Sequence, residues 1–214
     1  MISDKVKPLY VKLFLAIIYT VGVFGMLIKP ELFIPLTPLN LSITCLLLLA
    51  FYPYKEKDFI RYVIFLFAAG FAVEMIGVQT GKIFGSYYYG HALGFKLKHV
   101  PLLIGVNWVM LTLATQTIAQ KFSDKLYITS SIGATLMVIL DFLIEQVASK
   151  YQFWHWHNDT IPLQNFVAWF IISFFFHGVG SVMKFDKENK MAVFIFSLQI
   201  IFFTILNIVN FFIL

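Results

Sequence analysis

The sequence predicts an all-α fold, a polytopic membrane helix bundle with about seven transmembrane helices. Of the 214 residues, 60% are hydrophobic and only 13% are charged, and the mean hydropathy is +0.84. A soluble domain of this length would carry roughly a quarter charged residues. The chain has too few polar side chains to cover a soluble surface, so we expect residues 1–214 to form a single integral membrane domain.

Seven apolar runs predict the helices. A transmembrane helix needs about 20 mostly apolar residues. The runs are Tyr10–Ile28, Leu39–Tyr52, Phe59–Gln79, Val100–Gln120, Leu126–Ala148, Ile161–Met183 and Met191–Leu214. The second run is short and is bounded by Pro38 and Pro53, so a tilted span and a partly re-entrant segment both stay open for it.

The loop charges predict the orientation, because Lys and Arg are enriched in cytoplasmic loops. With a cytoplasmic N-terminus, eleven basic residues lie on the cytoplasmic side: Lys5, Lys7, Lys12, Lys55, Lys57, Arg61, Lys121, Lys125, Lys184, Lys187 and Lys190. Five lie on the other side: Lys29, Lys82, Lys96, Lys98 and Lys150. We therefore expect a multi-pass protein of the cell (inner) membrane, and we do not interpret the net charge of +5 as a sign of nucleic-acid binding.

Acidic residues within the apolar runs are the strongest functional signal. Asp141 and Glu145 lie four residues apart, which places them on one face of a helix. Glu74 lies in another run. A charged side chain inside a bilayer costs several kcal/mol, so such groups usually face a protein interior and mark function.

Further polar and aromatic residues are expected at a similar depth in the membrane. Asn107, Trp108, Asn165 and Trp169 follow the outer starts of two runs, and Tyr87, Trp154 and Trp156 lie in the loops 81–99 and 151–160 that would cap this side. Trp and Tyr residues also form interfacial belts, and Asn residues also join helices, so these structural alternatives stay open. His177 is expected to be a hydrogen-bonded residue of the bundle core.

Two blocks of residues resemble the membrane-embedded carotenoid biosynthesis hydratases. The first block runs from Glu74 through Gly77, Thr80, Gly81, Phe84, Gly85, Tyr87 and Tyr89 to Leu93-Gly94, Val100-Pro101 and Asn107-Trp108. The second comprises Asp141, Glu145, Trp154, Trp156, Ile161-Pro162, Asn165-Phe166 and Trp169. The resemblance is strongest over residues 60–183; Gln146 departs from it, because many relatives are expected to have Pro there, which puts a helix break at this point in doubt.

The resemblance implies a carotenoid 1,2-hydratase without a cofactor, which adds water to the terminal double bond of an acyclic end group such as that of lycopene, γ-carotene or bisanhydrobacterioruberin. The residues suit this chemistry, because desolvation in an apolar site raises the pKa of a carboxyl group and keeps an acid available near neutral pH. Asp141 is the favoured proton donor, since it lies deeper, with Glu74 and Glu145 as candidates for orienting the water. The expected substrate-binding residues are Tyr87, Asn107, Trp108, Trp154, Trp156, Asn165 and Trp169.

Other functions fit the sequence less well. A metal site is not expected, because His155 and His157 are spaced poorly for one helix face and lack a strong third ligand. A retinal-binding photoreceptor would need a Lys within the last helix, which has none after Lys190. The alternative that remains is a non-enzymatic carotenoid- or lipid-binding protein or a proton-coupled transporter, in which the same carboxylates would carry protons. In either case the expected partners are the carotenoid and membrane lipid.

Overall fold

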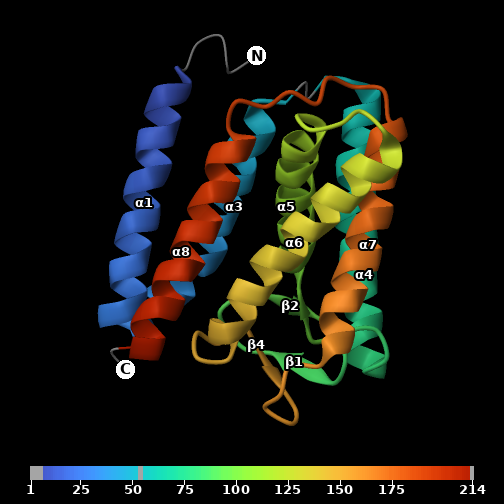
Figure 1. Cartoon of the computed structure of the whole chain (residues 1–214). Helices are drawn as coiled ribbons and strands as arrows, with labels where there is room; N and C mark the ends of the chain where they lie inside the picture. Colours follow the sequence, from blue (N-terminus) through green and yellow to red (C-terminus); the bar gives the residue numbers. More distant parts are fainter. Residues whose placement is uncertain (1–6, 53–54, 213–214) are drawn as a thin grey trace.

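The computed structural model describes residues 7–52 and 55–212. Lys5 and the last two residues of the predicted final run lie outside these ranges. Within them, seven helices are long and apolar enough to cross a membrane, as predicted. Six are single helices: α1 (Pro8–Ile28), α4 (Lys57–Thr80), α5 (Leu102–Gln120), α6 (Leu126–Ala148), α7 (Leu163–Val182) and α8 (Ala192–Phe212) (Figure 1).

The remaining span is longer than its apolar run indicated. It comprises α2 (Pro30–Phe33), the short 3-10 turn η2 (Ile34–Leu36) and α3 (Thr37–Ala50), and its 21 residues suffice to cross a bilayer. A proline stands in the first turn of each of these three pieces, where the missing N–H is tolerated. The predicted boundary at Pro38 was therefore wrong, because this proline begins a helical segment instead of ending a loop.

Helix α5 is the centre of the bundle. In its most apolar stretch of 18 residues, 78% of the residues are buried inside the protein, whereas the corresponding share in the other spans is 28–44%. It packs against α3, α4, α6 and α8. Polar residues in its second half are hydrogen-bonded: Thr115 Oγ1 donates to the Leu111 carbonyl and also meets Nε2 of His177, whose Nδ1 lies 2.6 Å from the Ser173 carbonyl. His177 thus has partners on both nitrogens, as expected of a core residue.

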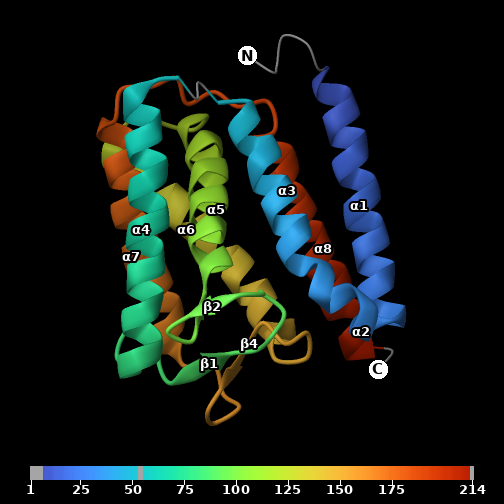
Figure 2. The same cartoon turned by 180° about the vertical axis from the view of Figure 1, so that it is seen from behind.

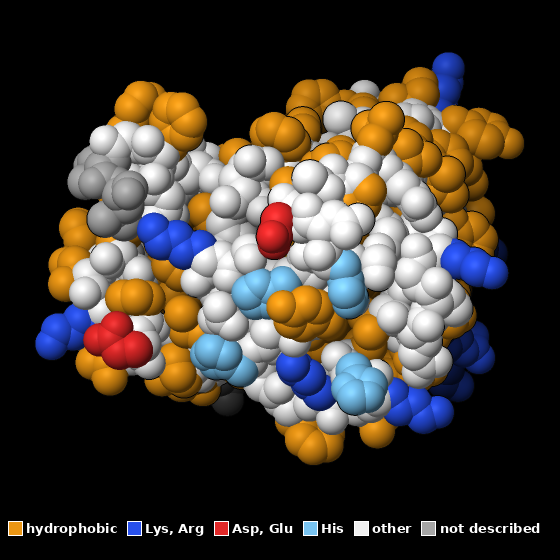
Figure 3. All heavy atoms as spheres, turned by 90° about the horizontal axis from the view of Figure 1, so that it is seen from below, with side chains coloured by type: hydrophobic (Ala, Val, Ile, Leu, Met, Phe, Trp, Pro, Cys, Tyr) orange, Lys and Arg blue, Asp and Glu red, His pale blue; other side chains and the backbone are white. Residues whose placement is uncertain are grey.

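Two short antiparallel strand pairs, not predicted from the sequence, cover one end of the bundle (Figure 1). Strand β1 (Tyr87–Tyr89) pairs with β4 (Trp154–Trp156), and β2 (Lys96–Leu97) pairs with β3 (Val100–Pro101). The first pair joins the two loops that the sequence had placed on the same side. Seen from this end, histidine side chains gather near the middle of the face, with Lys and Arg side chains around it (Figure 3).

Candidate active site

Glu74 lies near the end of α4 and is 3% exposed. Its Oε2 accepts hydrogen bonds from the Tyr87 hydroxyl at 2.6 Å and the Tyr89 hydroxyl at 2.7 Å, and its Oε1 accepts one from Trp108 Nε1 at 3.1 Å. The local fold follows from Gly81, which ends α4 with a φ of +64°, a conformation that favours glycine. The chain therefore reverses there and returns β1 beneath Glu74.

Glu145 lies near the end of α6 and is held by three N–H donors. Trp154 and Trp156 donate from Nε1 to its Oε2 at 3.1 and 2.8 Å, and Asn165 donates from Nδ2 to its Oε1 at 3.0 Å. The two tryptophans come from β4 and the asparagine from the first turn of α7. These N–H groups can donate a hydrogen bond but cannot accept one from a protonated carboxyl group, so the arrangement suits a carboxylate.

Asp141 lies one turn before Glu145 and is fully buried at 1% exposure. Its Oδ2 accepts a bond from the same Asn165 Nδ2 at 2.8 Å. Its Oδ1 is buried and has no hydrogen-bond partner within residues 7–52 and 55–212. The Asn165 amide therefore bridges the two carboxyl groups of α6, and helix α6 continues past Gln146 to Ala148 without a break.

Aromatic rings connect the two glutamates. The Tyr87 and Trp156 rings lie 5.2 Å apart between centroids, so the donor to Glu74 packs against a donor to Glu145. Behind them, Trp108 stacks on Trp169 at 4.4 Å. Burial, and then the neighbouring Glu74 carboxylate, raise the pKa of Tyr87 and Tyr89 well above the ordinary tyrosine value. Both phenols therefore stay protonated and able to donate.

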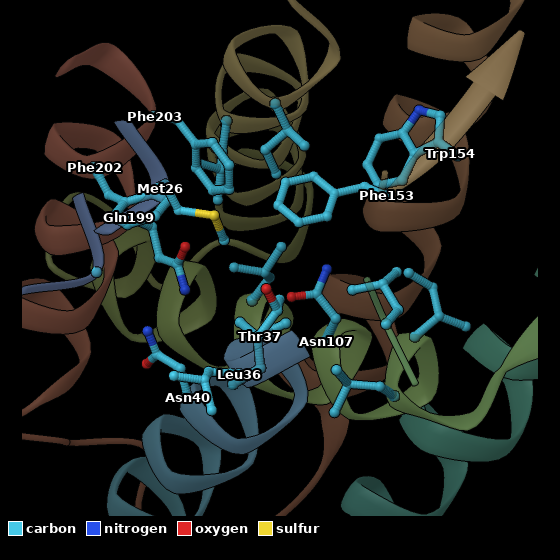
Figure 4. A pocket seen from close by; sticks show the side chains of 18 of the residues that line it. Met26, Leu36, Thr37, Asn40, Asn107, Phe153, Trp154, Gln199, Phe202 and Phe203 are labelled. Carbon is cyan, nitrogen blue, oxygen red and sulfur yellow. The ribbon is translucent and has the colours of Figure 1, made fainter. Parts of the chain in front are cut away.

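Glu74 and Glu145 line one cavity of about 330 Å³. Its walls are mainly apolar and aromatic and include residues from all seven membrane spans. Figure 4 shows part of it, with the Asn107 amide pointing inward between Thr37 and Phe153, and Gln199 and Asn40 on the opposite side. An apolar chamber with a few convergent polar groups is the usual form of a small-molecule site.

A family model described as carotenoid biosynthesis protein matches residues 37–214. The chain belongs to the carotenoid biosynthesis protein family. No curated protein and no solved structure matches the chain. The matched region contains every candidate site residue of this carotenoid biosynthesis protein, whereas α1 and α2 precede it.

Most of the residues singled out in the sequence line the cavity of this carotenoid biosynthesis protein: Glu74, Tyr87, Asn107, Glu145, Trp154, Trp156, Asn165 and Trp169. Two do not. Asp141 is hydrogen-bonded to Asn165, which lines the cavity, but does not line the cavity itself. Trp108 is fully buried, and its N–H donates to Glu74. Asn207, another polar residue of the membrane spans, donates to the Leu143 and Phe203 carbonyls and so joins helices.

Sequence reasoning missed several cavity residues. Tyr89 belongs to the family-like block but was not among the candidate site residues, although it bonds Glu74 as closely as Tyr87 does. Asn40 and Gln199 line the side of the cavity away from the strands. The sequence contains a signal for each of the three. Asn40 and Gln199 are polar residues inside apolar runs, and Tyr89 lies two residues after Tyr87, so the two side chains lie on the same face of a strand.

His155 and His157 lie on the loop side and not in the cavity. His155 Nδ1 lies 2.8 Å from the Ser149 hydroxyl, and His157 Nδ1 lies 3.2 Å from the Ser86 hydroxyl. Within the part of the chain that the structure describes, no group of three His, Cys, Asp or Glu residues is placed to share a metal ion.

Proposed function

We propose that this protein is a carotenoid hydratase, which adds water across the terminal C1–C2 double bond of an acyclic carotenoid end group. The observation that carries the proposal is the placement of Glu74 and Glu145, from different helices, on one aromatic cavity within the membrane spans. Membership of the carotenoid biosynthesis family supports a carotenoid substrate. The two carboxyl groups supply what hydration of an alkene needs, namely one proton donor and one proton acceptor.

The hydrogen bonds favour Glu74 as the acid and Glu145 as the base. The Glu74 partners include two hydroxyl groups, which can accept as well as donate, so a protonated Glu74 keeps its hydrogen bonds. The Glu145 partners are all N–H donors. Asp141, favoured as the donor from its depth alone, is not among the cavity-lining residues. We assign it a positioning role instead, acting through Asn165.

The reaction then proceeds in two steps. The Glu74 proton moves to C-2, the π electrons form the new C–H bond, and a tertiary cation is left at C-1. A water molecule held by Asn107 and Glu145 attacks C-1, and its surplus proton passes to Glu145. The sum is one water added, and a proton transfer from Glu145 back to Glu74 resets the site. The faces of the Trp and Tyr rings stabilise the cation without trapping it.

The proposal is tested in a bacterial host that makes lycopene and lacks a hydratase. Expression of the protein should give carotenoids heavier by one water per reacted end, detected by liquid chromatography with mass spectrometry. Glu74→Gln and Glu145→Gln should each lower product formation by about 10²–10⁴-fold, the usual contribution of a general acid or base. Glu31→Gln, the same change at an exposed residue of α2, is the matched control.

A second readout separates the two roles. In deuterated medium, a Glu145→Gln protein that still protonates the alkene should return substrate labelled with deuterium, because the uncaptured cation loses a proton again. Glu74→Gln should return unlabelled substrate. Binding of lycopene by the wild-type protein without any added water or label would contradict the hydratase and favour a carotenoid carrier.

We also propose that the active site faces the outer side of the cell membrane, with the N-terminus in the cytoplasm. The termini lie at opposite ends of the bundle, and the strand-covered end is the one next to the C-terminus (Figure 1). Fewer basic residues lie at this end, which favours the outer side. Fusing alkaline phosphatase, active only outside the cytoplasm, to the C-terminus should give an active reporter, and an inactive one would reverse the orientation.

A further inference from the structure

The cavity reaches the lipid-facing surface beside α1. Four of the side chains that line it are more than a third exposed: Ile17 (62%) and Val21 (51%) on α1, Leu36 (48%) at the end of η2 and Leu39 (59%) on α3. The other lining residues that the structure describes are buried or half-buried. Exposed residues of a membrane span contact hydrocarbon, so these four mark a mouth that opens sideways into the bilayer.

The opposite side of the cavity is closed. Strands β1 and β4 cover it with Tyr87, Tyr89 and Trp156, each no more than 9% exposed. Glu74 and Glu145 lie on this closed side. A ligand from the membrane would therefore enter at α1 and α3 and reach the carboxylates with its leading end.

The arrangement of the helices is consistent with such a mouth. Helices α1 and α3 come together at the α2 turn and diverge from it along their length (Figures 1 and 2). The residues at the mouth are aliphatic, and none of the Lys and Arg residues that the structure describes lines the cavity. The volume of about 330 Å³ lies near the lower limit of ligand sites, which is roughly 300 Å³. It can enclose a carotenoid end group but not a whole carotenoid.

We propose that the mouth between α1 and α3 is the portal for the polyene chain of the substrate, so that only the reacting end is enclosed while the rest of the carotenoid stays in lipid. The inference rests on the proposed function for the identity of the ligand. It also assigns a role to α1, which lies before the region that the family model matches.

Gly22 is the residue of α1 that we expect to determine which chains can pass. It lines the cavity, and a Cβ at this position would lie 3.4 Å from the Phe202 ring and 3.9 Å from the Asn40 amide. These are ordinary contact distances, so a side chain here can begin without a clash. A large side chain would extend into the passage and narrow it.

The test compares substitutions at the mouth with one elsewhere on the same helix. Gly22→Phe and Val21→Trp narrow the mouth. Leu13→Trp adds comparable bulk to α1 at a residue that is 52% exposed and does not line the cavity. The two mouth variants should convert lycopene about tenfold more slowly or worse, the scale of steric discrimination in apolar pockets, whereas Leu13→Trp should match the wild type.

A short substrate separates the portal from the chemistry. Myrcene carries the same terminal double bond as lycopene and is small enough to lie wholly within the cavity. Gly22→Phe should lower lycopene hydration by a much larger factor than myrcene hydration. Unchanged lycopene conversion in both mouth variants would refute the portal. So would an equal loss of lycopene and myrcene hydration in a folded Gly22→Phe protein, or a loss of lycopene conversion in Leu13→Trp equal to that in the mouth variants.

Binding of lycopene to the purified protein tests the portal independently of the hydratase proposal. Lycopene that remains bound to the purified protein is measured by its absorbance, whether or not it is hydrated. Wild-type protein that binds lycopene without hydrating it would contradict the hydratase alone, and a lower bound fraction in Gly22→Phe would still support the portal. Wild-type protein that neither binds nor hydrates lycopene would contradict both. Co-purified phospholipid that changes in Gly22→Phe while lycopene does not would make the mouth a lipid site and refute the portal.

Discussion

The three consecutive tyrosines of β1 offer a sharp test of the active site. Tyr87 and Tyr89 donate hydrogen bonds to Glu74, whereas Tyr88 between them is 51% exposed and stacks on His155 at 5.1 Å. Replacing each by Phe removes one hydroxyl group and keeps the ring. Tyr87→Phe and Tyr89→Phe should therefore impair catalysis, and Tyr88→Phe is the matched control.

The size of the effect follows from the charge that develops on Glu74. When Glu74 releases its proton, the carboxylate that remains is stabilised by the two short hydroxyl bonds, at 2.6 and 2.7 Å. A hydrogen bond to a charged group contributes about 1.5–3 kcal/mol, so each loss should lower the rate of hydration by roughly 10- to 100-fold. The substitution makes Glu74 a weaker acid without removing it.

The assay is lycopene hydration by purified protein in detergent or nanodiscs, with thermal unfolding measured on the same samples. Tyr88→Phe should keep the wild-type rate. Wild-type rates in both Tyr87→Phe and Tyr89→Phe, or an equal loss in Tyr88→Phe, would refute the argument that these hydroxyls support proton donation by Glu74.

Two further predictions concern the helices that hold the site. In Asn165→Leu, both carboxyl groups on α6 lose a hydrogen-bond donor, and we expect the free energy of unfolding to fall by about 1–3 kcal/mol. Adding Asp141→Asn to this variant should recover part of the loss. A double-mutant cycle in which the two effects simply add would contradict the bridging role of Asn165. In Gly133→Ala, the new Cβ meets the ring of His177, and we expect a loss of about 1–3 kcal/mol. Gly178→Ala, where the nearest atom would be 3.7 Å away, should be neutral or slightly stabilising in thermal unfolding, and equal losses at both glycines would contradict the close packing of α6 on α7.

The membrane spans could be predicted because the bilayer restricts what the chain can form. Every backbone polar group inside lipid needs an internal partner, so an apolar run of sufficient length becomes a helix. The exception, residues 30–38, shows where this reasoning ends. The second predicted run began only after Pro38, but the prolines at positions 30, 35 and 38 each stand in a first turn, and the helical path continues through them.

The candidate site was predictable in its composition and less so in its geometry. The four-residue spacing placed Asp141 and Glu145 on one face of α6, and their common donor Asn165 confirms that they lie together. Which of the two reaches the cavity depends on how α7 crosses α6, and a single sequence does not contain that crossing. Depth in the membrane alone therefore favoured Asp141, whereas Glu145 lines the cavity.

The strands escaped prediction for a related reason. Strands of three residues carry little signal, and their partner is far away in the sequence. Tyrosines and tryptophans at the ends of membrane helices also fit an interfacial belt. Only the matching alternation, with Tyr87 and Tyr89 opposite Trp156 and Trp154, distinguishes a paired ladder from a belt.

This pairing has a consequence for how the protein can change. Alternate residues of a strand point to opposite faces, so a slip of one residue exchanges the two faces completely. Deleting a single residue from the loop before β1 would turn Tyr88 toward Glu74 and would turn Tyr87 and Tyr89 toward water, while the seven spans stayed intact. A change of two residues in the length of this loop would therefore keep the same side chains facing inward. A change of one residue would turn them outward.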